Sequence, residues 1–320
     1  VPQPLEYAGR ASADKRAEIA QALKNHGIAA ALITAPSSLA WLFNIRGGDV
    51  IRSPLPLGQT ILKNDGSAEL FIEPAKISDG LLAWLGNTVA VKAPGEVEAS
   101  LAAFRGQSVL IDGQLSSAYW MQAIRDAGAA PLAADDPCLL PRACKNPVEI
   151  AGTRAAHIRD GALLTTFLHW VATEAQGAPF SEIEIAQKLE SIRRASDGLK
   201  DLSFDTISGF GPHGALPHYK VNVQSDMRIG KGNLLLVDSG AQFMDGTTDV
   251  TRTVAIGEPS NEHRRMFTLV LKGHIALATV KFPAGTTGTQ LDALARQFLW
   301  AGGFDYDHGT GHGVGVYLGV

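Results

Sequence analysis

The sequence predicts an α/β protein of two domains, each containing both strands and helices. Its 320 residues exceed what one ordinary hydrophobic core holds, so two cores are expected. In the first half, short apolar runs typical of strands alternate with segments of helical periodicity, which predicts a mixed sheet covered by helices. The second half opens with two well-capped helices and continues into strands. We therefore expect one domain over residues 1–144 and a second over residues 145–320.

The composition is that of an ordinary globular protein. It argues against a protein that binds nucleic acid, spans a membrane or depends on disulfides. Hydrophobic residues make up 45% of the chain and charged residues 19%, which suits a folded core with a polar surface. A formal charge of −4 gives no electrostatic footprint for nucleic acid or an anionic membrane, so neither is an expected partner. No apolar run approaches the ~20 residues that cross a bilayer. Cys138 and Cys144 lack CxxC spacing, which disfavours a zinc knuckle or disulfide framework and fits a reducing cytoplasm.

Neither end of the sequence has the features of a natural terminus. The chain begins at Val1 without a methionine and without the charged and apolar regions of a signal peptide. It stops within residues 315–320, which we predict to be an apolar strand. We therefore expect the chain to be a fragment.

Local signals predict the elements of the first domain. Ser12 begins a segment of helical periodicity, and Gly27 is a suitable residue to end it. Asn64-Asp65-Gly66 separates two strand-like runs, which is a strong signal for a β-hairpin. The expected elements are a helix over 12–27, a strand over 28–33, a short helix over 37–42, strands over 57–63, 68–73 and 108–112, and a helix over about 116–127.

Two capping signatures open the second domain. Asn146 is a helix N-cap with Glu149 as its capping-box partner, which predicts a long helix to about residue 176. Ser181 and Glu184 repeat this pattern and predict a second helix ending near residue 198. The remaining expected elements are a strand over 204–208, a hairpin around residues 238–249, helices over about 260–280 and 289–301, and the terminal strand.

The predicted hairpin is the most informative stretch of the chain. The apolar run 234–237 ends at Asp238, a connection rich in Gly, Asp and Thr follows, and Asp249 opens a second run of β-branched residues. Two carboxylates facing each other across such a connection repel unless a cation lies between them, and a divalent metal ion is the usual one. The alternative is that both aspartates are ordinary solvated loop residues.

Four of the nine histidines lie in glycine-rich polar segments: His213, His218, His308 and His312. The last two have the HxxxH spacing of zinc ligands on one helix face, but the glycines around them disfavour a helix and no Glu follows His308. A glycine-rich turn instead suits one ligand histidine and one substrate-facing histidine. We interpret the other five as packed or surface residues: His26, His157, His169, His263 and His274.

Asp238, Asp249 and His312 together make an oxygen-rich ligand set with one imidazole. Such a set favours Mn²⁺, with Zn²⁺ or Co²⁺ also possible, over a thiolate zinc site. Three ligands cannot saturate two metal ions, and no carboxylate follows His312 in the sequence.

These residues carry a resemblance to a known family. The run Asp-Ser-Gly-Ala-Gln-x-x-Asp-Gly-Thr-Thr-Asp-Val-Thr-Arg-Thr at 238–253, with His-Gly-Thr-Gly-His-Gly-Val-Gly at 308–315, resembles aminopeptidase P (Xaa-Pro aminopeptidase) of the creatinase and prolidase superfamily. Asn44-Ile45-Arg46-Gly47 is similar to a middle-domain motif of its large three-domain form. Residues 145–149 resemble the start of its catalytic domain. The resemblance covers essentially the whole chain.

The resemblance implies a creatinase-like middle domain followed by a pita-bread catalytic domain. It also implies that the first of the three domains precedes Val1. The family's two glutamate ligands would lie beyond Val320, so we expect a catalytic domain truncated at its C-terminal end, with an incomplete site.

The resemblance also implies roles for individual residues. The family has a dinuclear centre, usually of manganese, held by two Asp, one His and two Glu. Position by position, Asp238 and Asp249 match metal ligands, with Asp249 bridging, and His312 matches the imidazole ligand. His218 matches a histidine that binds substrate and supports proton transfer. His308 matches a histidine that lines the substrate pocket.

The activity implied is a metal-dependent Xaa-Pro aminopeptidase, which releases the N-terminal residue from peptides with proline in second position by attack of a metal-held hydroxide. The expected partners are such peptides and a second copy of the chain in a homodimer. One alternative is a prolidase-type Xaa-Pro dipeptidase, which predicts a shorter N-terminal region. Another is a metal-free pita-bread module that binds peptides, although a pure binder has no need of paired buried carboxylates.

Overall fold

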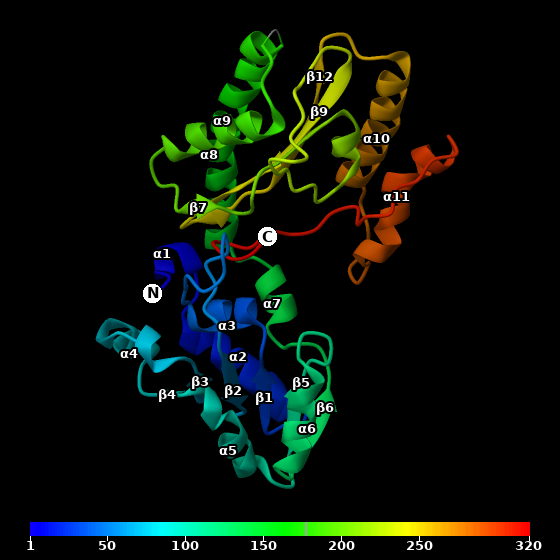
Figure 1. The fold of residues 1–320 in the computed structure, drawn as a ribbon. Helices are drawn as coiled ribbons and strands as arrows, with labels where there is room; N and C mark the ends of the chain where they lie inside the picture. Colours follow the sequence, from blue (N-terminus) through cyan, green and yellow to red (C-terminus); the bar gives the residue numbers. More distant parts are fainter. Residues whose placement is uncertain (177) are drawn as a thin grey trace.

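The computed structural model describes residues 1–176 and 178–320. Two parts of mixed helix and strand follow one another along the chain, and Figure 1 shows them one above the other. The red C-terminal end of the chain does not stay with the last helices but returns to the boundary between the two parts (Figure 1). Residues far apart in sequence therefore meet at this boundary.

The first part is built on a six-stranded mixed sheet in the order β4-β3-β2-β1-β5-β6. The β1–β2 and β2–β3 pairs are antiparallel and the remaining pairs are parallel. The strands are β1 Ala30–Ile33, β2 Gln59–Lys63, β3 Ala68–Phe71, β4 Val89–Lys92, β5 Ser108–Ile111 and β6 Ala130–Ala133. The helices are α1 Leu5–Ala8, α2 Ser12–Asn25, α3 Pro36–Phe43, α4 Asp79–Leu85, α5 Val97–Leu101, α6 Ala118–Asp126 and α7 Leu139–Ala143, with short 3₁₀ turns at Pro74–Lys76, Pro94–Glu96 and Ala102–Phe104.

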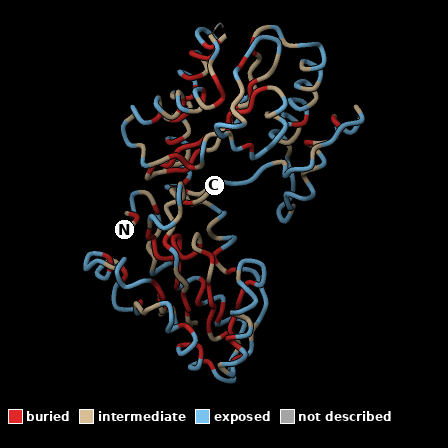
Figure 2. Tube along the Cα trace, viewed as in Figure 1, coloured by how far each residue is buried: buried red, intermediate tan, exposed pale blue. Residues whose placement is uncertain are grey.

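Both faces of this sheet are covered, as the central strand β1 shows. All four residues of β1 are buried. Ala31 and Ile33 pack in one hydrophobic cluster, while Ala30 and Leu32 pack in another on the opposite face. This alternation is the period of two expected of a strand between two layers. Figure 2 shows the corresponding concentration of buried residues around the sheet.

The second part contains two small antiparallel sheets, in the orders β11-β10-β7 and β12-β9-β8. The strands are β7 Asp201–Leu202, β8 Ile207–Phe210, β9 Asn233–Ser239, β10 Ala241–Phe243, β11 Gly246–Thr247 and β12 Val250–Ile256. The helices are α8 Pro147–Trp170, followed by a π-helical turn at Val171–Ala175, α9 Glu182–Arg194, α10 Asn261–Thr279 and α11 Gly288–Trp300, with a 3₁₀ turn at Gly211–Ala215. Both predicted capping boxes form, at the starts of α8 and α9.

Several expectations need correction. The strand expected over 204–208 begins only at Ile207, and residues 315–320 form no strand. Tyr317 has a φ of 52°, a left-handed conformation that does not continue a strand. β6 was not predicted because it contains Pro131, which favours a linker; as an edge strand, it tolerates the missing N–H. The other strands and α-helices that the sequence did not predict are β4, β7, β10, β11, α1, α4, α5 and α7; residues 239–248 were expected to be a turn-like connection.

Two further observations bear on the protein's class. Cys138 is buried and Cys144 is exposed, and both are free. In the part of the chain that the structure describes, no helix is both long enough and apolar enough to span a membrane.

Glu69 on β3 makes the stability of the first part depend on pH. Burial alone would raise the pKa of Glu69, but hydrogen bonds from Lys63, Lys92 and Ser100 outweigh it and lower the pKa to about 2. Because the folded-state pKa lies below the ordinary 4.5, the stabilisation is complete above that value and is lost as pH falls towards 2. Glu69→Gln should therefore lose about 2–3 kcal/mol at pH 7 and much less at pH 2.5, measured by urea unfolding.

Glu73 provides the matched control, because it is exposed just beyond the end of the same strand. Glu73→Gln should change the free energy of unfolding by less than about 0.5 kcal/mol at either pH. If the loss of unfolding free energy in Glu69→Gln is as large at pH 2.5 as at pH 7, the ionised carboxylate of Glu69 is not its source.

Candidate metal centre

The β9–β12 hairpin brings Asp238 and Asp249 together. Ser239 pairs with Val250 and Asp238 with Thr251, so the two aspartates lie at the same end of the antiparallel ladder. The connection between them folds into a second small hairpin, β10–β11, which pairs with β7. A Cβ atom at Gly240 would lie 2.0 Å from the carbonyl oxygen of Thr248, so only glycine allows this close approach.

The pair of carboxylates carries uncompensated negative charge. Burial raises the pKa of Asp249, and the charge of Asp238 and a hydrogen bond shared with it raise the pKa further. His312 opposes the shift by less than burial and the Asp238 charge raise it, and the opposing effect of His157 is smaller still. The Oδ1 atom of Asp238 is buried, and no described residue provides it with a hydrogen-bond partner. Such an orphaned carboxylate oxygen beside a second carboxylate fits a divalent cation between them.

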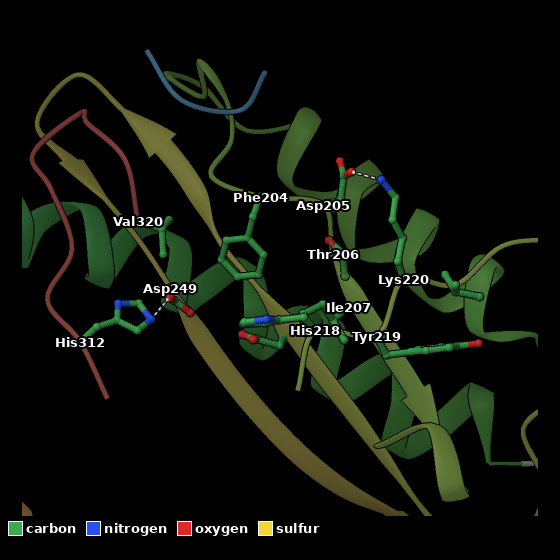
Figure 3. Close-up of a pocket in the computed structure, with 12 residues that line it drawn as sticks. Phe204, Asp205, Thr206, Ile207, His218, Tyr219, Lys220, Asp249, His312 and Val320 are labelled. Carbon is green, nitrogen blue, oxygen red and sulfur yellow. Dashed lines mark ion pairs between the residues drawn. The ribbon is translucent and has the colours of Figure 1, made fainter. Parts of the chain in front are cut away.

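His312 faces this pair from the glycine-rich segment near the end of the chain. Its Nε2 lies 3.3 Å from Oδ2 of Asp249 (Figure 3). Its Nδ1 lies 3.0 Å from the carbonyl oxygen of Gly313. The two ring nitrogens therefore face a carbonyl oxygen and a carboxylate oxygen, and Nε2 is the one turned towards the aspartate pair. The side chain is 60% exposed, so little besides its own backbone restrains it.

A cavity of about 480 Å³ opens beside the hairpin. Four of the five predicted site residues line it, namely His218, Asp238, Asp249 and His312 (Figure 3). The rest of the wall is formed by Phe204, Asp205, Thr206, Ile207, Tyr219, Lys220, Val221 and Val320.

The fifth predicted residue, His308, does not line this cavity. It is exposed, its ring stacks on that of Tyr306 at 4.6 Å, and its Nδ1 lies 2.9 Å from the carbonyl oxygen of Gly309. Within residues 1–176 and 178–320, no three His, Cys, Asp or Glu side chains are grouped closely enough to hold a metal ion by themselves. The ligand set of Asp238, Asp249 and His312 therefore stays a prediction, as do the catalytic roles of His218 and His308.

Glu182 organises the cavity wall that carries His218. It is fully buried at the first turn of α9. Its carboxylate accepts hydrogen bonds from the backbone N–H groups of Phe210 and Met227, at 2.6 and 3.1 Å. The Tyr219 hydroxyl donates to it at 3.0 Å, and His213 Nδ1 lies 2.9 and 3.0 Å from its two oxygens. The sequence did not predict this role, because an acid at a helix start is normally read as part of the cap.

Asp160 supports the hairpin from behind. Its carboxylate forms a two-point ion pair with Arg193, at 2.7 and 2.9 Å, and both side chains are buried. The hydroxyl of Thr248 donates to the same carboxylate at 2.7 Å and accepts a hydrogen bond from the backbone N–H of Ala241. Because Thr248 directly precedes Asp249, this chain of bonds fixes the backbone beside the predicted ligand.

The first part of the chain reaches the rim of the cavity through Arg52. Its Nη1 lies 2.6 Å from Asp201 Oδ1, and its Nε lies 3.0 Å from Asp205 Oδ1. Lys220, on the opposite side, lies 3.8 Å from Asp205 Oδ2. Sequence reasoning missed this cluster, since no local pattern relates residues that are 150 positions apart.

Comparison with known families decides the relationship. Residues 151–319 match the model of metallopeptidase family M24. The chain belongs to metallopeptidase family M24. Residues 1–149 match the creatinase/prolidase N-terminal domain that accompanies the M24 region here.

Individual proteins that resemble this M24 chain are named Xaa-Pro or X-prolyl aminopeptidases. It is 40% identical to probable Xaa-Pro aminopeptidases P of Neosartorya fischeri and Talaromyces stipitatus, covering 99% of this chain and 50% of each relative. The chain thus spans about half the length of these curated relatives. It matches the crystal structure of an X-prolyl aminopeptidase from Caenorhabditis elegans, described as a cytosolic enzyme with a dinuclear active site. That match has a TM-score of 0.93 and 35% identity over 100% of this chain and 53% of the other.

The prolidase of Pyrococcus horikoshii shares the fold, with a TM-score of 0.73 at 23% identity over 96% of this chain and 84% of that one. Together, the comparisons confirm the predicted fold class, a creatinase-like mixed-sheet domain followed by a pita-bread M24 domain.

Proposed function

We propose that this M24 chain belongs to an Xaa-Pro aminopeptidase, which releases the N-terminal residue from peptides with proline in second position. The observation that carries the proposal is the paired carboxylates of Asp238 and Asp249, which share one cavity with His312 and His218. The relatives named Xaa-Pro aminopeptidase P support the specificity. We place the domain division at 144/145, with the site in the domain over 145–320.

Two divalent metal ions are the proposed cofactors, and the donor set favours Mn²⁺ over the alternatives Zn²⁺ and Co²⁺. Asp238, Asp249 and His312 would supply part of their ligand set, because two carboxylates and an imidazole suit such ions and the buried Oδ1 of Asp238 lacks a partner among the described residues. The chemistry that such ions supply is activation of water and polarisation of the scissile carbonyl group.

The chain's own residues would orient the peptide and handle its protons. A protonated imidazole is both a hydrogen-bond donor and a general acid, so His218 on the cavity wall would donate a hydrogen bond to the substrate and give a proton to the leaving nitrogen. Phe204 and Ile207 supply apolar surface to the same cavity. Because a peptide bond to proline has no N–H, a pocket that fits the ring without an acceptor for that hydrogen favours proline.

We further propose a homodimer that works in the cytoplasm. The free cysteines and the C. elegans enzyme described as cytosolic support the compartment. The prolidase alternative is supported no better, since prolidases such as the Pyrococcus horikoshii protein match at 23% identity and share the fold.

Asp249→Asn tests the proposed metal centre. The exchange keeps the shape of the side chain but removes one negative charge, so the Mn²⁺ affinity of the full-length protein, measured by titration calorimetry, should fall at least ~100-fold. Without metal, the variant should be more stable than the wild type at pH 7. The raised folded-state pKa of Asp249 means that its ionisation lowers stability as pH rises through that pKa, and Asn removes this cost. The stability difference between the variant and the wild type should disappear as the pH falls below 3.8, the ordinary pKa of an aspartate.

Asp245→Asn is the matched control, because Asp245 lies in the same connection but pairs with Arg159 at 2.6 Å and does not line the cavity. It should leave Mn²⁺ affinity within about twofold of the wild type. Unchanged affinity in Asp249→Asn would remove Asp249 from the ligand set.

Substrate length separates the remaining alternatives. With Mn²⁺ added to the full-length protein, an aminopeptidase cleaves Xaa-Pro-Xaa peptides, whereas cleavage of Xaa-Pro dipeptides alone would favour the prolidase alternative. Peptide binding that is indifferent to chelators, without cleavage of either substrate, would favour the metal-free module.

A further inference from the structure

Arg46 links the first part of the chain to the segment that carries His312. We propose that Arg46 is a positioning residue, which anchors residues 316–317 and thereby holds His312 beside Asp249. The inference rests on the proposed metal centre for its consequence, but the anchoring itself is independent of metal.

Arg46 is buried, and its side chain donates hydrogen bonds to four backbone carbonyl groups. Its side chain donates to Val316 O at 2.9 Å through Nη2 and to Tyr317 O through Nε. Its Nη1 donates to Ala40 O and Ile45 O, at 3.1 and 2.9 Å. The residue is 5% exposed, and its burial lowers the pKa to about 9. These carbonyl groups offset the desolvation of the guanidinium.

The residues next to Arg46 fix its direction. Asn44 ends α3 in a left-handed conformation, with φ 50°. Its side chain accepts a hydrogen bond from Lys15 Nζ at 2.6 Å and donates to the carbonyl oxygen of Arg10 at 2.8 Å. The backbone of Arg46 exchanges two hydrogen bonds with Val1, at 2.6 and 2.7 Å. The motif at residues 44–47 thus holds the Arg46 guanidinium against the carbonyl groups of residues 316–317.

The other side of that segment is held by the hairpin connection. Leu318 O accepts hydrogen bonds from Gln242 Nε2 at 2.8 Å and from Thr247 Oγ1 at 3.2 Å. Both residues belong to the β10–β11 connection between Asp238 and Asp249. Residues 316–318 are therefore clamped between Arg46 and the structure that carries the two aspartates.

The clamp matters for His312 because the chain leading to it has few restraints. Glycines occupy positions 309, 311, 313 and 315, and a glycine-rich segment loses much conformational entropy when it is ordered. The imidazole itself is 60% exposed. The nearest fixed point on its C-terminal side is the pair of carbonyl groups that Arg46 binds, four and five residues away.

Arg46→Met tests the inference, since methionine retains an apolar stem but has no donors. Amide hydrogen exchange at Leu318 and Gly315 should become at least tenfold faster, because these N–H groups bond to Thr247 Oγ1 and to Gly319 O only while the segment is clamped. Relaxation of the ¹³C-labelled His312 ring should show increased mobility, and Mn²⁺ affinity should fall at least tenfold. Arg46→Lys, which retains the charge but loses the fork of donors, should give intermediate values.

Arg16→Met is the matched control. Arg16 is also a buried arginine of the first part, 4% exposed, and donates to Gly66 O and Thr88 Oγ1, which are not part of the clamp. It should lower stability without accelerating exchange at Leu318.

The outcomes separate the two proposals. Wild-type exchange at Leu318 and wild-type His312 mobility in folded Arg46→Met would overturn the inference, and so would a loosened segment with unchanged Mn²⁺ affinity. If Arg46→Met fails to fold, the same readouts on folded Arg46→Lys decide in its place. If the full-length wild-type protein binds no Mn²⁺, the proposed metal centre fails, while the exchange and His312 mobility data still decide whether Arg46 holds the segment.

Discussion

Asp160→Asn is expected to destabilise the folded chain by about 3–5 kcal/mol, measured by urea unfolding at pH 7. Asp160 and Arg193 are 1% and 0% exposed, and two hydrogen bonds join their charged groups. The neutral amide keeps the shape but leaves a buried guanidinium without a counter-charge, which is far more costly than losing a surface ion pair. Amide exchange at Ala241 should also accelerate, because its N–H bonds to the Thr248 hydroxyl that Asp160 orients.

Glu190→Gln is the matched control on the neighbouring ion pair of α9. Glu190 pairs with Arg194 at the surface, where the side chains are 30% and 53% exposed, so the expected cost is below about 1 kcal/mol. A double variant, Asp160→Leu with Arg193→Met, should recover much of the loss, because neither buried charge then remains. A loss of less than 1 kcal/mol in Asp160→Asn would show that Arg193 finds another counter-charge or reaches water.

The fold was largely predictable because its strongest signals are local. The capping boxes at Asn146 and Ser181 need only residues three positions apart, and both form as expected. The hairpin strands around Asp238 and Asp249 likewise follow from a continuous apolar run and a β-branched run. The pairing of the two aspartates could be predicted for the same reason, because closing the hairpin brings them together.

The parts that could not be predicted depend on contacts between distant positions. Arg46 and Arg52 lie in polar loops of the first part, and no local pattern shows that they reach residues 316–317 or Asp205. His213 and His218 look alike in the sequence, yet one bonds to Glu182 and the other lines the cavity. The end of the chain has the apolar character of a strand, but its carbonyl groups bond to side chains instead.

Glu182 is the second position at which a single change should have a large effect. Its buried carboxylate gathers donors from Phe210, His213, Tyr219 and Met227. A carboxylate has enough lone pairs for all of them, whereas the amide of Gln offers one oxygen and brings two hydrogens of its own. Glu182→Gln should therefore leave at least two buried donors unsatisfied and cost about 3 kcal/mol or more in urea unfolding.

Glu184→Gln, two residues further along α9, separates this effect from helix capping. Glu184 also accepts a capping hydrogen bond, from the backbone N–H of Ser181, but its side chain is 48% exposed, so the expected cost is below about 1 kcal/mol. If both variants lose the same free energy of unfolding, Glu182 contributes no more than an ordinary acidic residue at the start of a helix.

The consequence of Glu182→Gln should extend from stability to the candidate site. Tyr219 is anchored by Glu182 and stacks on His213 at 4.3 Å, and it lies between His218 and Lys220, which both face the cavity. Losing that anchor should raise the mobility of the His218 ring, measured by ¹³C relaxation, while Mn²⁺ affinity changes little because Asp238 and Asp249 stand on separate strands. Substrate affinity should then weaken without metal loss. If Glu182→Gln instead loses Mn²⁺ affinity while the His218 ring stays rigid, Glu182 supports the β9–β12 hairpin and not the cavity wall that carries His218.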